Sequence, residues 1–553
     1  MEKSREDAKE TKFDYVTDVV VVGTGGGGFT AALAAREKGK DVLMLESTEL
    51  IGGCTAKSGG GMWVPNNSIM KEAGVSDSHE EARAYLDDII GDVGPASSPD
   101  RREAYLTEGV KMVEWLKSIG VEFTYLPGYC DYYPHNKGGS VKGRGITPKV
   151  YNIRKLGEWG NKIRALNTVL LVYNHEVAAI CKPFCPRGIW TAFKVYGVRR
   201  YAAKLIGKKY CACGSALIAW LLEAALKRDI KIWLESPMVE LIEKDGRVIG
   251  VVIEKDKKRM RIKANQGVIL AAGGFAKNQE MREKYLPKPT STEWSCASDG
   301  DKGDAIRAGM AIGAETALME EAWGGPVFPY KGGAAFILWE RSNPHSIMVD
   351  SKGNRFMNES ASYTDAWHWT YEAHAKESAI PAYLIFDTQH RHKYAFIRTL
   401  PYQSLNIAIK ANTLEELAKK CDIDPNALVR TVTRFNELAK IGKDSDFNRG
   451  DSAYDRFYSD PSVKPNPNLG PILKPPFYAV KLMPGELSTK GGLLTDEYSR
   501  VIHKNGSIIK GLYCTGNSSA SVTGRVYPGP GASVGPTTIF GYIAGKHVAD
   551  LSD

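Results

Sequence analysis

The chain has 553 residues, of which 43% are hydrophobic, and a formal net charge of +9. This length predicts two to four domains with large cores, and no apolar run approaches the roughly 18 residues that cross a bilayer. Residues 1–11 are charged and lack the apolar core of a secretory signal. We therefore expect a cytoplasmic protein with reduced thiols. Its nine cysteines match no haem or zinc spacing, so no metal is expected.

A strand followed by a glycine-rich turn organises the chain. Residues 18–22 contain four consecutive valines, and β-branched side chains suit a strand that is packed on both faces. Residues 29–38 read as an Ala-rich helix. The turn between them includes a G-x-G-x-x-G pattern and contains Gly23, Gly25, Gly26 and Gly28. Such a turn lets backbone amides approach a pyrophosphate at the positive N-terminus of the helix, which predicts a Rossmann-like dinucleotide site.

Two features after this helix indicate which dinucleotide is bound. Residues 41–45 predict a second strand that leads into Glu46 and Ser47, and a carboxylate at this place suits a ribose diol. A second glycine-rich loop follows at 51–62, with Gly53, Thr55, Ser58, Gly59, Gly60 and Gly61 as expected cofactor contacts. This loop resembles the G-G-x-T/S-A-x-S-G-G loop of the fumarate reductase-like and ketosteroid dehydrogenase flavoproteins. The resemblance implies non-covalent FAD, and Glu46 favours FAD over FMN because only FAD carries an adenosine ribose.

The next region combines regular core elements with an aromatic loop. Residues 80–90 and 99–119 carry the apolar spacing of core helices, and residues 121–125 read as a strand. The loop that follows, residues 128–135, holds three tyrosines. Taken alone, such a cluster is more typical of a tyrosine-rich surface loop than of a functional site.

Residues 164–210 differ from the rest of the chain in composition. Eight lysines and arginines and no acidic residue lie from Cys181 to Lys209, interleaved with Phe, Trp and Tyr. Aromatic rings suit the headgroup depth of a membrane while cations meet anionic lipid, so this segment predicts docking to the inner face of the cell membrane. The alternative is a basic excursion that packs on its own domain or on a partner subunit. Nucleic-acid binding is not expected, because no recognition fold surrounds the segment.

Both ends of the chain are predicted to build the cofactor domain. A helix at 215–227, a strand at 230–235 and a hairpin at 240–253 around Asp245-Gly246 follow the basic segment. Buried strands at 268–275 and 511–517 include small residues that we expect to contact the cofactor: Ala272, Gly273, Gly274, Gly516 and Asn517. The predicted fold is therefore α/β. A two-dinucleotide-fold FAD domain is formed by residues 1–322 and 485–553, and an α+β catalytic domain is inserted at 323–484.

The motif Y-P-G-P-G at residues 527–531 is the second informative stretch. Its prolines fix the backbone and Gly531 leaves its amide accessible. The Tyr527 hydroxyl and the Gly531 N–H can therefore converge on one oxygen, as in an oxyanion pocket. The alternative is a rigid turn that only closes the domain.

Several motifs together resemble the 3-ketosteroid Δ1-dehydrogenases over most of the chain. Besides the glycine turn and Y-P-G-P-G, these are G-D-A-I-R-A-G at 303–309, N-E-S at 358–360, T-K-G-G-L at 489–493 and G-N-S-S-A-S at 516–521. On this basis we also expect cofactor contacts at Asp304, Ser533 and Val534. The basic aromatic insertion resembles the subgroup that acts on cholest-4-en-3-one.

The resemblance implies roles for five residues of the substrate site. Tyr527 and Gly531 match the pair that binds the 3-keto oxygen. Tyr363 matches the tyrosine that abstracts the proton, and Tyr132 matches the tyrosine that supports this base, which overrides the surface-loop interpretation of 128–135. Phe336 matches an aromatic residue that lines the substrate pocket.

The implied reaction is the FAD-dependent 1,2-dehydrogenation of a 3-keto-4-ene steroid such as cholest-4-en-3-one. A proton leaves carbon 2, a hydride passes from carbon 1 to flavin N5, and a quinone or an electron-transfer protein is the external acceptor. Because a free tyrosine has a pKa of about 10, Tyr132 is expected to lower the pKa of Tyr363. Three alternatives remain open: a Δ4-(5α)-dehydrogenase, another fumarate reductase-like flavoprotein, and a non-catalytic flavin electron-transfer or binding subunit.

Overall fold

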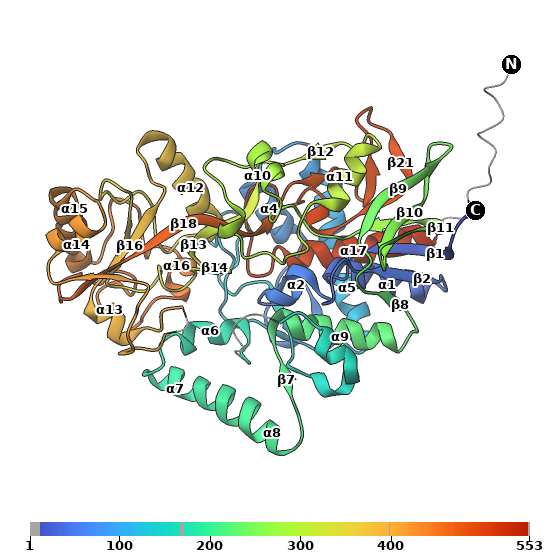
Figure 1. Cartoon of the computed structure of the whole chain (residues 1–553). Coiled ribbons are helices and arrows are strands. Elements are labelled where there is room, and N and C mark those ends of the chain that lie inside the picture. Colours follow the sequence, from blue (N-terminus) through green and yellow to red (C-terminus); the bar gives the residue numbers. More distant parts are fainter. Residues whose placement is uncertain (1–11, 166–170, 398, 551–553) are drawn as a thin grey trace.

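A computed structural model describes residues 12–165, 171–397 and 399–550 (Figure 1). The charged leader expected at residues 1–11 lies outside the described residues. No helix in the described ranges is long and apolar enough to cross a membrane. All nine cysteines are free thiols, in agreement with the expected reduced state.

The cofactor part is built on an eight-stranded sheet with the order β20-β21-β10-β11-β1-β2-β8, in which β9 pairs with β10 and β21 also pairs with β11. The strands are β1 (Tyr15–Val22), β2 (Val42–Leu45), β8 (Lys231–Trp233), β9 (Met238–Lys244), β10 (Arg247–Lys255), β11 (Lys258–Leu270), β20 (Arg500–Ile502) and β21 (Ile508–Cys514). From β8 through β2, β1 and β11 to β21 the strands run parallel. Strands from the two ends of the chain therefore share one sheet.

The valine strand β1 is buried on both faces, as its composition predicts. Val19 and Val21 belong to the core on one side of the sheet, and Val20 and Val22 to the core on the other. On the first side α1 (Gly26–Glu37) packs against α9 (Cys213–Leu226) and α17 (Val534–Ala549), and α17 packs against α5 (Pro99–Ser118). A Cβ on Gly545 of α17 would lie 2.2 Å from the Ala31 carbonyl oxygen, so α1 and α17 approach closely because small residues face each other.

Two local predictions for this sheet can be compared with the structure. The hairpin is confirmed, because Arg247 pairs with Lys244 and the two residues between them, Asp245 and Gly246, have φ values of 53° and 71°. Positive φ at both central residues is typical of a tight two-residue turn. The stretch 268–275, predicted as a buried strand ending in a small-residue turn, contains the end of β11 at Leu270 and then the small residues of a loop. Gly273, with a φ of +84°, lies in the loop that leaves the sheet.

A second sheet forms a separate lobe, at the left of Figure 1. Its six antiparallel strands have the order β14-β13-β18-β16-β15, and β17 pairs with β18. They are β13 (Ala322–Tyr330), β14 (Gly333–Phe336), β15 (Ser346–Val349), β16 (Ala382–Phe386), β17 (Ile409–Ala411) and β18 (Phe477–Thr489). The chain enters through β13 and returns through its neighbour β18, where Ala322 pairs with Thr489. The helices of this lobe are α12 (Tyr363–Lys376), α13 (Thr388–Lys393), α14 (Leu414–Lys420), α15 (Pro425–Ile441) and α16 (Ala453–Phe457).

The remaining elements surround the cofactor sheet. They are α2 (Gly53–Lys57), α3 (Ser68–Glu72), α4 (His79–Ile90), α10 (Gln279–Tyr285), α11 (Asp304–Ala311), β3 (Met62–Trp63), β4 (Phe123–Tyr125), β5 (Gly145–Pro148), β12 (Thr316–Ala317) and β19 (Gly492–Leu493). The basic segment forms α6 (Asn174–Ile180), then α7 (Pro186–Ala192), a π-helix (Phe193–Ala202) and α8 (Ala203–Leu205) in direct succession. Figure 1 shows these helices along the lower edge of the molecule. At its end, β7 (Tyr210–Cys211) pairs with β6 (Tyr151–Asn152).

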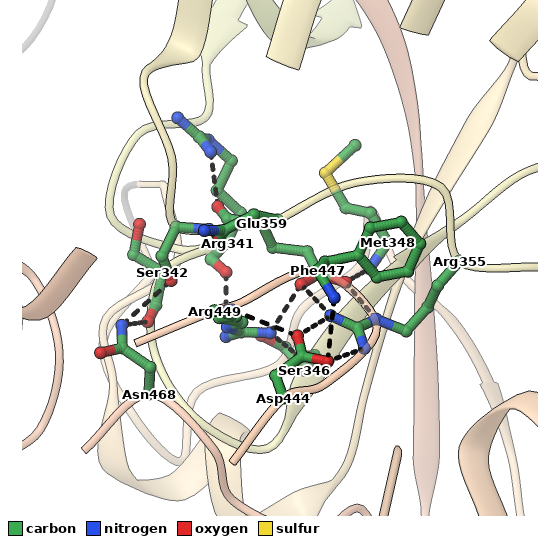
Figure 2. Close-up of polar contacts among 12 residues, drawn as sticks. Arg341, Ser342, Ser346, Met348, Arg355, Glu359, Asp444, Phe447, Arg449 and Asn468 are labelled. Atoms are coloured by element: carbon green, nitrogen blue, oxygen red, sulfur yellow. Dashed lines mark hydrogen bonds and ion pairs between the residues drawn. The ribbon is translucent and has the colours of Figure 1, made fainter. Parts of the chain in front are cut away.

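A buried ion network stabilises the lobe next to the N-E-S motif (Figure 2). The Glu359 carboxylate accepts hydrogen bonds from Arg355 at 2.8 Å, from Arg449 at 3.2 Å and from the Met348 N–H at 3.1 Å. Arg355 also pairs with Asp444 at 2.9 Å. All of these ionic side chains are almost completely excluded from solvent. Burial alone would raise the pKa of Glu359, but the two guanidinium groups lower it overall, so the group is charged at neutral pH.

Glu359→Gln should destabilise the lobe strongly. Removing one partner of a buried ionic cluster leaves the other charges uncompensated, at a cost of about 3 to 5 kcal/mol. We expect a clearly lower melting temperature by circular dichroism. Glu416→Gln is the control, since Glu416 forms an exposed pair with Lys420 in the same lobe and should leave the melting temperature unchanged. Equal melting temperatures for the two variants would contradict the stabilising role of the network.

Candidate functional site

A cleft opens where the glycine turn leaves β1. Eleven of the predicted cofactor residues line it: Gly23, Gly25, Glu46, Ser47, Gly53, Thr55, Ala272, Gly273, Asp304, Gly516 and Asn517. Residues that the sequence analysis did not single out also line it, among them Thr24, Gly27, Cys54, Arg164, Ser298, Asp301 and Thr537. Segments from residues 22–55, 271–304 and 516–537 thus meet at one cleft.

The glycine turn fits a diphosphate for reasons visible in its backbone. Gly23 has a φ of +109°, and a Cβ there would lie 2.2 Å from the Ala271 carbonyl oxygen. Gly25 precedes α1 and has no side chain that could cap it, so the N-terminus of the helix stays accessible to an anion. Gly28 allows the helix to pack closely against the turn. A Cβ there would lie 2.1 Å from the Gly23 oxygen and prevent the close contact of helix and strand.

Glu46 lies where a ribose-binding carboxylate is expected, directly after β2. Its carboxylate accepts hydrogen bonds from the Thr24 hydroxyl and from the Thr48 N–H and hydroxyl, at 3.0 and 2.9 Å for the last two. Glu46 is buried and lines the cleft. The two threonines therefore hold the carboxylate in one orientation at the cleft wall, which fits the recognition of a diol.

Nine predicted cofactor residues do not line this cleft as the structure describes it: Gly26, Gly28, Ser58, Gly59, Gly60, Gly61, Gly274, Ser533 and Val534. Close packing accounts for several of the glycines. A Cβ on Gly59 would lie 2.5 Å from the Asn174 side chain, and one on Gly60 would lie 2.4 Å from the Cys213 backbone. Ser533 lines a smaller adjoining cavity together with Gly516 and Asn517.

Tyr132, Tyr363 and Tyr527 come from three distant segments and meet in one buried cluster. The ring centroids of Tyr363 and Tyr527 lie 4.8 Å apart, those of Tyr132 and Tyr527 5.0 Å, and those of Tyr132 and Tyr363 5.7 Å. Phe336, on β14, packs edge-on against Tyr363 at 5.2 Å. The structure thus brings together the aromatic residues that the resemblance assigns to the substrate site.

The turn that carries Tyr527 also presents the Gly531 amide. Gly531 has a φ of +97°, and a Cβ there would lie 2.4 Å from the backbone of Gly61, so only glycine fits. Burial raises the pKa of Tyr527, and the neighbouring polar groups of Ser533, Tyr363 and Gly531 lower it in part. The Tyr527 hydroxyl lies 3.4 Å from the Ser533 hydroxyl. These groups therefore approach the same hydroxyl. A substrate oxygen placed beside it would receive two donors, one phenolic and one from the backbone.

The expected effect of Tyr132 on Tyr363 is not what the structure shows. Burial raises the pKa of Tyr363 well above its ordinary value, and the neighbouring Tyr527 phenol adds to this effect. Tyr132 meets Tyr363 through edge-to-face ring packing, at an interplanar angle of 79°. The expectation that Tyr363 has a lowered pKa is therefore wrong for this arrangement, because a desolvated phenolate is costly.

Further tyrosines extend the cluster and were not identified from the sequence. The Tyr129 hydroxyl lies 3.2 Å from that of Tyr132 and 2.7 Å from that of Tyr458. The Tyr454 ring lies 4.1 Å from the Tyr132 ring. The signals in the sequence were the aromatic loop at 128–135, which contains Tyr129, and the crowding of aromatic residues at 454–458, and no motif there indicates which side chains they meet.

The N-E-S motif explains how Tyr363 is held at the first position of α12. Arg341 donates to the Glu359 carbonyl and, at 2.9 Å, to the Ala361 carbonyl, as Figure 2 shows for Glu359. Asn468 donates to the Ser360 hydroxyl at 3.0 Å. The ion network also fixes the Glu359 carboxylate. Contacts at Glu359, Ser360 and Ala361 therefore hold the backbone that precedes Tyr363.

Comparisons with known proteins agree with this geometry. The FAD binding domain family matches residues 18–534. A 3-oxosteroid 1-dehydrogenase of Mycobacterium tuberculosis is 42% identical, over 96% of this chain and 98% of that protein. The crystal structure of a 3-ketosteroid Δ1-dehydrogenase from Sterolibacterium denitrificans, in complex with 1,4-androstadiene-3,17-dione, is 37% identical with a TM-score of 0.92, covering 97% of this chain and 99% of that chain.

A more distant structure shares the fold alone. The 3-ketosteroid Δ4-(5α)-dehydrogenase from Rhodococcus jostii RHA1 is 22% identical with a TM-score of 0.67, covering 99% of both chains. The predicted α/β flavoprotein fold and the predicted FAD cofactor are confirmed by these matches. The chain belongs to the 3-oxosteroid 1-dehydrogenase family of FAD-binding flavoproteins.

Proposed function

We propose that this chain removes hydrogen from carbons 1 and 2 of 3-keto-4-ene steroids, such as cholest-4-en-3-one, to form 1,4-dienes. The observation that carries the proposal is the buried aromatic cluster in which the Tyr363 and Tyr527 rings lie 4.8 Å apart, with Gly531 on the same turn as Tyr527. The relatives named 3-oxosteroid 1-dehydrogenase support the same reaction class. We assign substrate binding to the lobe at 323–484 and FAD binding to residues 1–322 and 485–553.

The proposed chemistry begins at the 3-keto oxygen. Tyr527 and Gly531 donate hydrogen bonds to it, and each donor stabilises the developing enolate by about 3 kcal/mol, as in oxyanion holes. The carbonyl thereby acidifies the hydrogens on carbon 2, and the phenolate form of Tyr363 accepts one of them as a proton to become the neutral phenol. FAD supplies a two-electron acceptor for the hydride that leaves carbon 1. Phe336 lines the pocket beside the base, and we infer that a quinone or an electron-transfer protein later removes the electrons.

Burial limits the ability of Tyr363 to act as a base at neutral pH. Its raised pKa leaves only a small phenolate fraction at neutral pH. We assign to Tyr132 the packing of the Tyr363 ring, which it meets edge-on at 5.7 Å, while the Tyr132 hydroxyl lies 3.2 Å from that of Tyr129.

Anaerobic mixing of the FAD-loaded protein with 5α-androstane-3,17-dione tests the function. Bleaching of the flavin with a 1-ene product is expected, whereas a 4-ene product would indicate Δ4-(5α)-dehydrogenation. Tyr363→Phe and Tyr527→Phe should each slow bleaching by about 100-fold to 1,000-fold while FAD stays bound. Tyr513→Phe is the matched control, because it removes a buried hydroxyl that lies outside the tyrosine cluster, 2.8 Å from the His547 ring nitrogen Nδ1. Unchanged bleaching in both site variants would contradict the assignment.

We further propose that the helices at 174–205 dock to the inner face of the cell membrane. Their exposed apolar side chains are Ile189, Trp190, Phe193, Tyr196, Val198, Tyr201 and Leu205, with Phe184 and Ile206 at the two ends. Exposed basic residues accompany them: Arg187, Arg200, Lys204, Lys208 and Lys209. Two of the basic residues counted in the sequence are internal, since Arg199 pairs with Glu176 and Lys182 is buried. The presence of exposed apolar and cationic side chains on the same helical segment, residues 184–209, supports binding at a membrane interface.

Serine substitutions at Trp190, Phe193 and Tyr201 should weaken this docking. We expect the wild type to co-sediment with phosphatidylcholine vesicles that contain phosphatidylglycerol, and the triple variant to stay largely in the supernatant. Ile441→Ser and Leu473→Ser are controls, because these residues are exposed elsewhere on the molecule. Co-sedimentation of the triple variant at the wild-type level would contradict docking. A change in oligomeric state instead would favour packing on a partner subunit.

A further inference from the structure

Lys490, in the T-K-G-G-L motif, is a lysine with no solvent exposure. Its ammonium group donates hydrogen bonds to three successive carbonyl oxygens: those of Gly524 at 3.1 Å, Arg525 at 2.8 Å and Val526 at 2.7 Å. The next residue in the chain is Tyr527. One buried cation thus contacts every carbonyl of the segment 524–526 that leads into this tyrosine, and the Thr523 hydroxyl also donates to the Val526 carbonyl at 3.3 Å.

A second contact connects Lys490 to the ring of Tyr527. The Lys490 nitrogen lies 4.4 Å from the centroid of the Trp323 ring. Trp323 packs edge-on against Tyr527 at 5.2 Å and an angle of 80°. The Trp323 indole N–H donates to the Asn517 side chain at 2.9 Å, and Asn517 lines the cofactor cleft. The same ammonium therefore fixes both the backbone before Tyr527 and the indole beside its ring.

The backbone after Tyr527 is fastened independently of Lys490. The Pro528 carbonyl accepts hydrogen bonds from the Tyr132 N–H at 2.9 Å and from the Tyr85 hydroxyl at 2.6 Å. Loss of the lysine contacts would consequently free only one side of the turn. The local effect would be a displaced phenol in a protein that still folds and binds its cofactor.

Three N–H donors for three carbonyls require the charged form of the lysine, because a neutral amine has only two. Burial is the largest influence on this group and lowers the pKa of Lys490 to about 7, with Arg525 acting in the same direction. The carboxylates of Glu321 and Asp365 oppose this effect. Glu321 is itself held by Arg525 and by His368, each at 2.8 Å.

We propose that Lys490 is a positioning residue that holds the Tyr527 hydroxyl at the place of the substrate's 3-keto oxygen, through the carbonyls of residues 524–526 and the Trp323 ring. The inference rests on the proposed function, because it concerns the group that binds the ketone. Lys490 does not touch the substrate in this account. Its substitution should therefore affect recognition of the keto group more than binding of the rest of the steroid.

Lys490→Met is the direct test, since methionine keeps the length of the side chain and removes the donors. Binding of androsta-1,4-diene-3,17-dione and of its analogue without the 3-keto oxygen is followed by the change in flavin absorbance. The variant should bind the ketone about tenfold more weakly, bind the 3-deoxy analogue as the wild type does, and lose about 100-fold in kcat/KM. A merely structural role would instead weaken both ligands together with FAD retention.

Lys255→Met is the matched control. The Lys255 ammonium also donates to a backbone carbonyl, that of Leu234 at 3.1 Å, and lies 5.9 Å from the centroid of the Trp233 ring. These contacts belong to the segment around β8. The control should therefore keep wild-type discrimination between the two ligands and wild-type turnover.

If Lys490→Met does not fold, a measurement on the wild type tests whether Lys490 positions Tyr527. The pKa of Lys490 is lowered, so the three-donor contact exists below about pH 7 and is lost as the pH rises through this value. Preference for the 3-keto ligand should decline between about pH 6 and about pH 9 while FAD stays bound. His368→Gln should show the same decline, which separates Lys490 from the other titratable group beside Glu321.

The outcomes distinguish the inference from the function on which it rests. A wild type that reduces no flavin with any 3-keto steroid would contradict the proposed function. An active wild type whose ketone preference does not change with pH, or a folded Lys490→Met variant with wild-type preference, would overturn the role of Lys490 alone.

Discussion

The backbone contact between Gly531 and Gly61 joins the keto-binding turn to the second glycine-rich loop, and the geometry of the site depends on it. A Cβ on Gly531 would lie 2.4 Å from the Gly61 carbonyl carbon. Two residues further along this loop, the Trp63 indole donates to Asp131 at 2.8 Å, and Asp131 precedes Tyr132. The loop therefore sets the position of Tyr132 relative to Tyr527, which explains why rings from distant segments stack at 5.0 Å.

The inserted lobe supplies the remaining tyrosine by a different physical means. Tyr363 starts α12, and the loop before it is fixed by buried charges that are satisfied within the lobe, with Glu359 between Arg355 and Arg449. Disrupting such a network once it is buried costs several kcal/mol of folding free energy, roughly 3 to 5 kcal/mol for the loss of one partner. It therefore holds the proposed base rigidly against a phenol from the C-terminal part of the chain, and little reorganisation is needed when a substrate binds.

The local elements were predictable from the sequence, because their signals are local. Four valines, the glycine turn and the Asp245-Gly246 hairpin specify their conformation through side-chain branching and positive φ. The long-range tyrosine contacts have no such signal. Tyr132, Tyr363 and Tyr527 were identified only through a family resemblance, and Tyr129, Tyr454 and Tyr458 were missed because nothing in their spacing indicates what they meet.

Burial was the other property that the sequence could not supply. Burial reverses the expected pKa shift of Tyr363. It also removes Lys490, a lysine of the T-K-G-G-L motif, from water, so that backbone carbonyls must accept its hydrogen bonds. Several glycines of the second loop, predicted as cofactor contacts, are also packed tightly in the structure, as Gly60 is against Cys213. A glycine pattern alone does not distinguish these two requirements.

The most direct test of the proposed site is a crystal structure of the FAD-loaded enzyme with androsta-1,4-diene-3,17-dione. The account predicts the 3-keto oxygen within about 3 Å of both the Tyr527 hydroxyl oxygen and the Gly531 nitrogen, with the Tyr363 hydroxyl beside carbon 2. A steroid whose 3-keto oxygen is directed away from the turn at 527–531, or whose carbon 2 lies far from Tyr363, would contradict it.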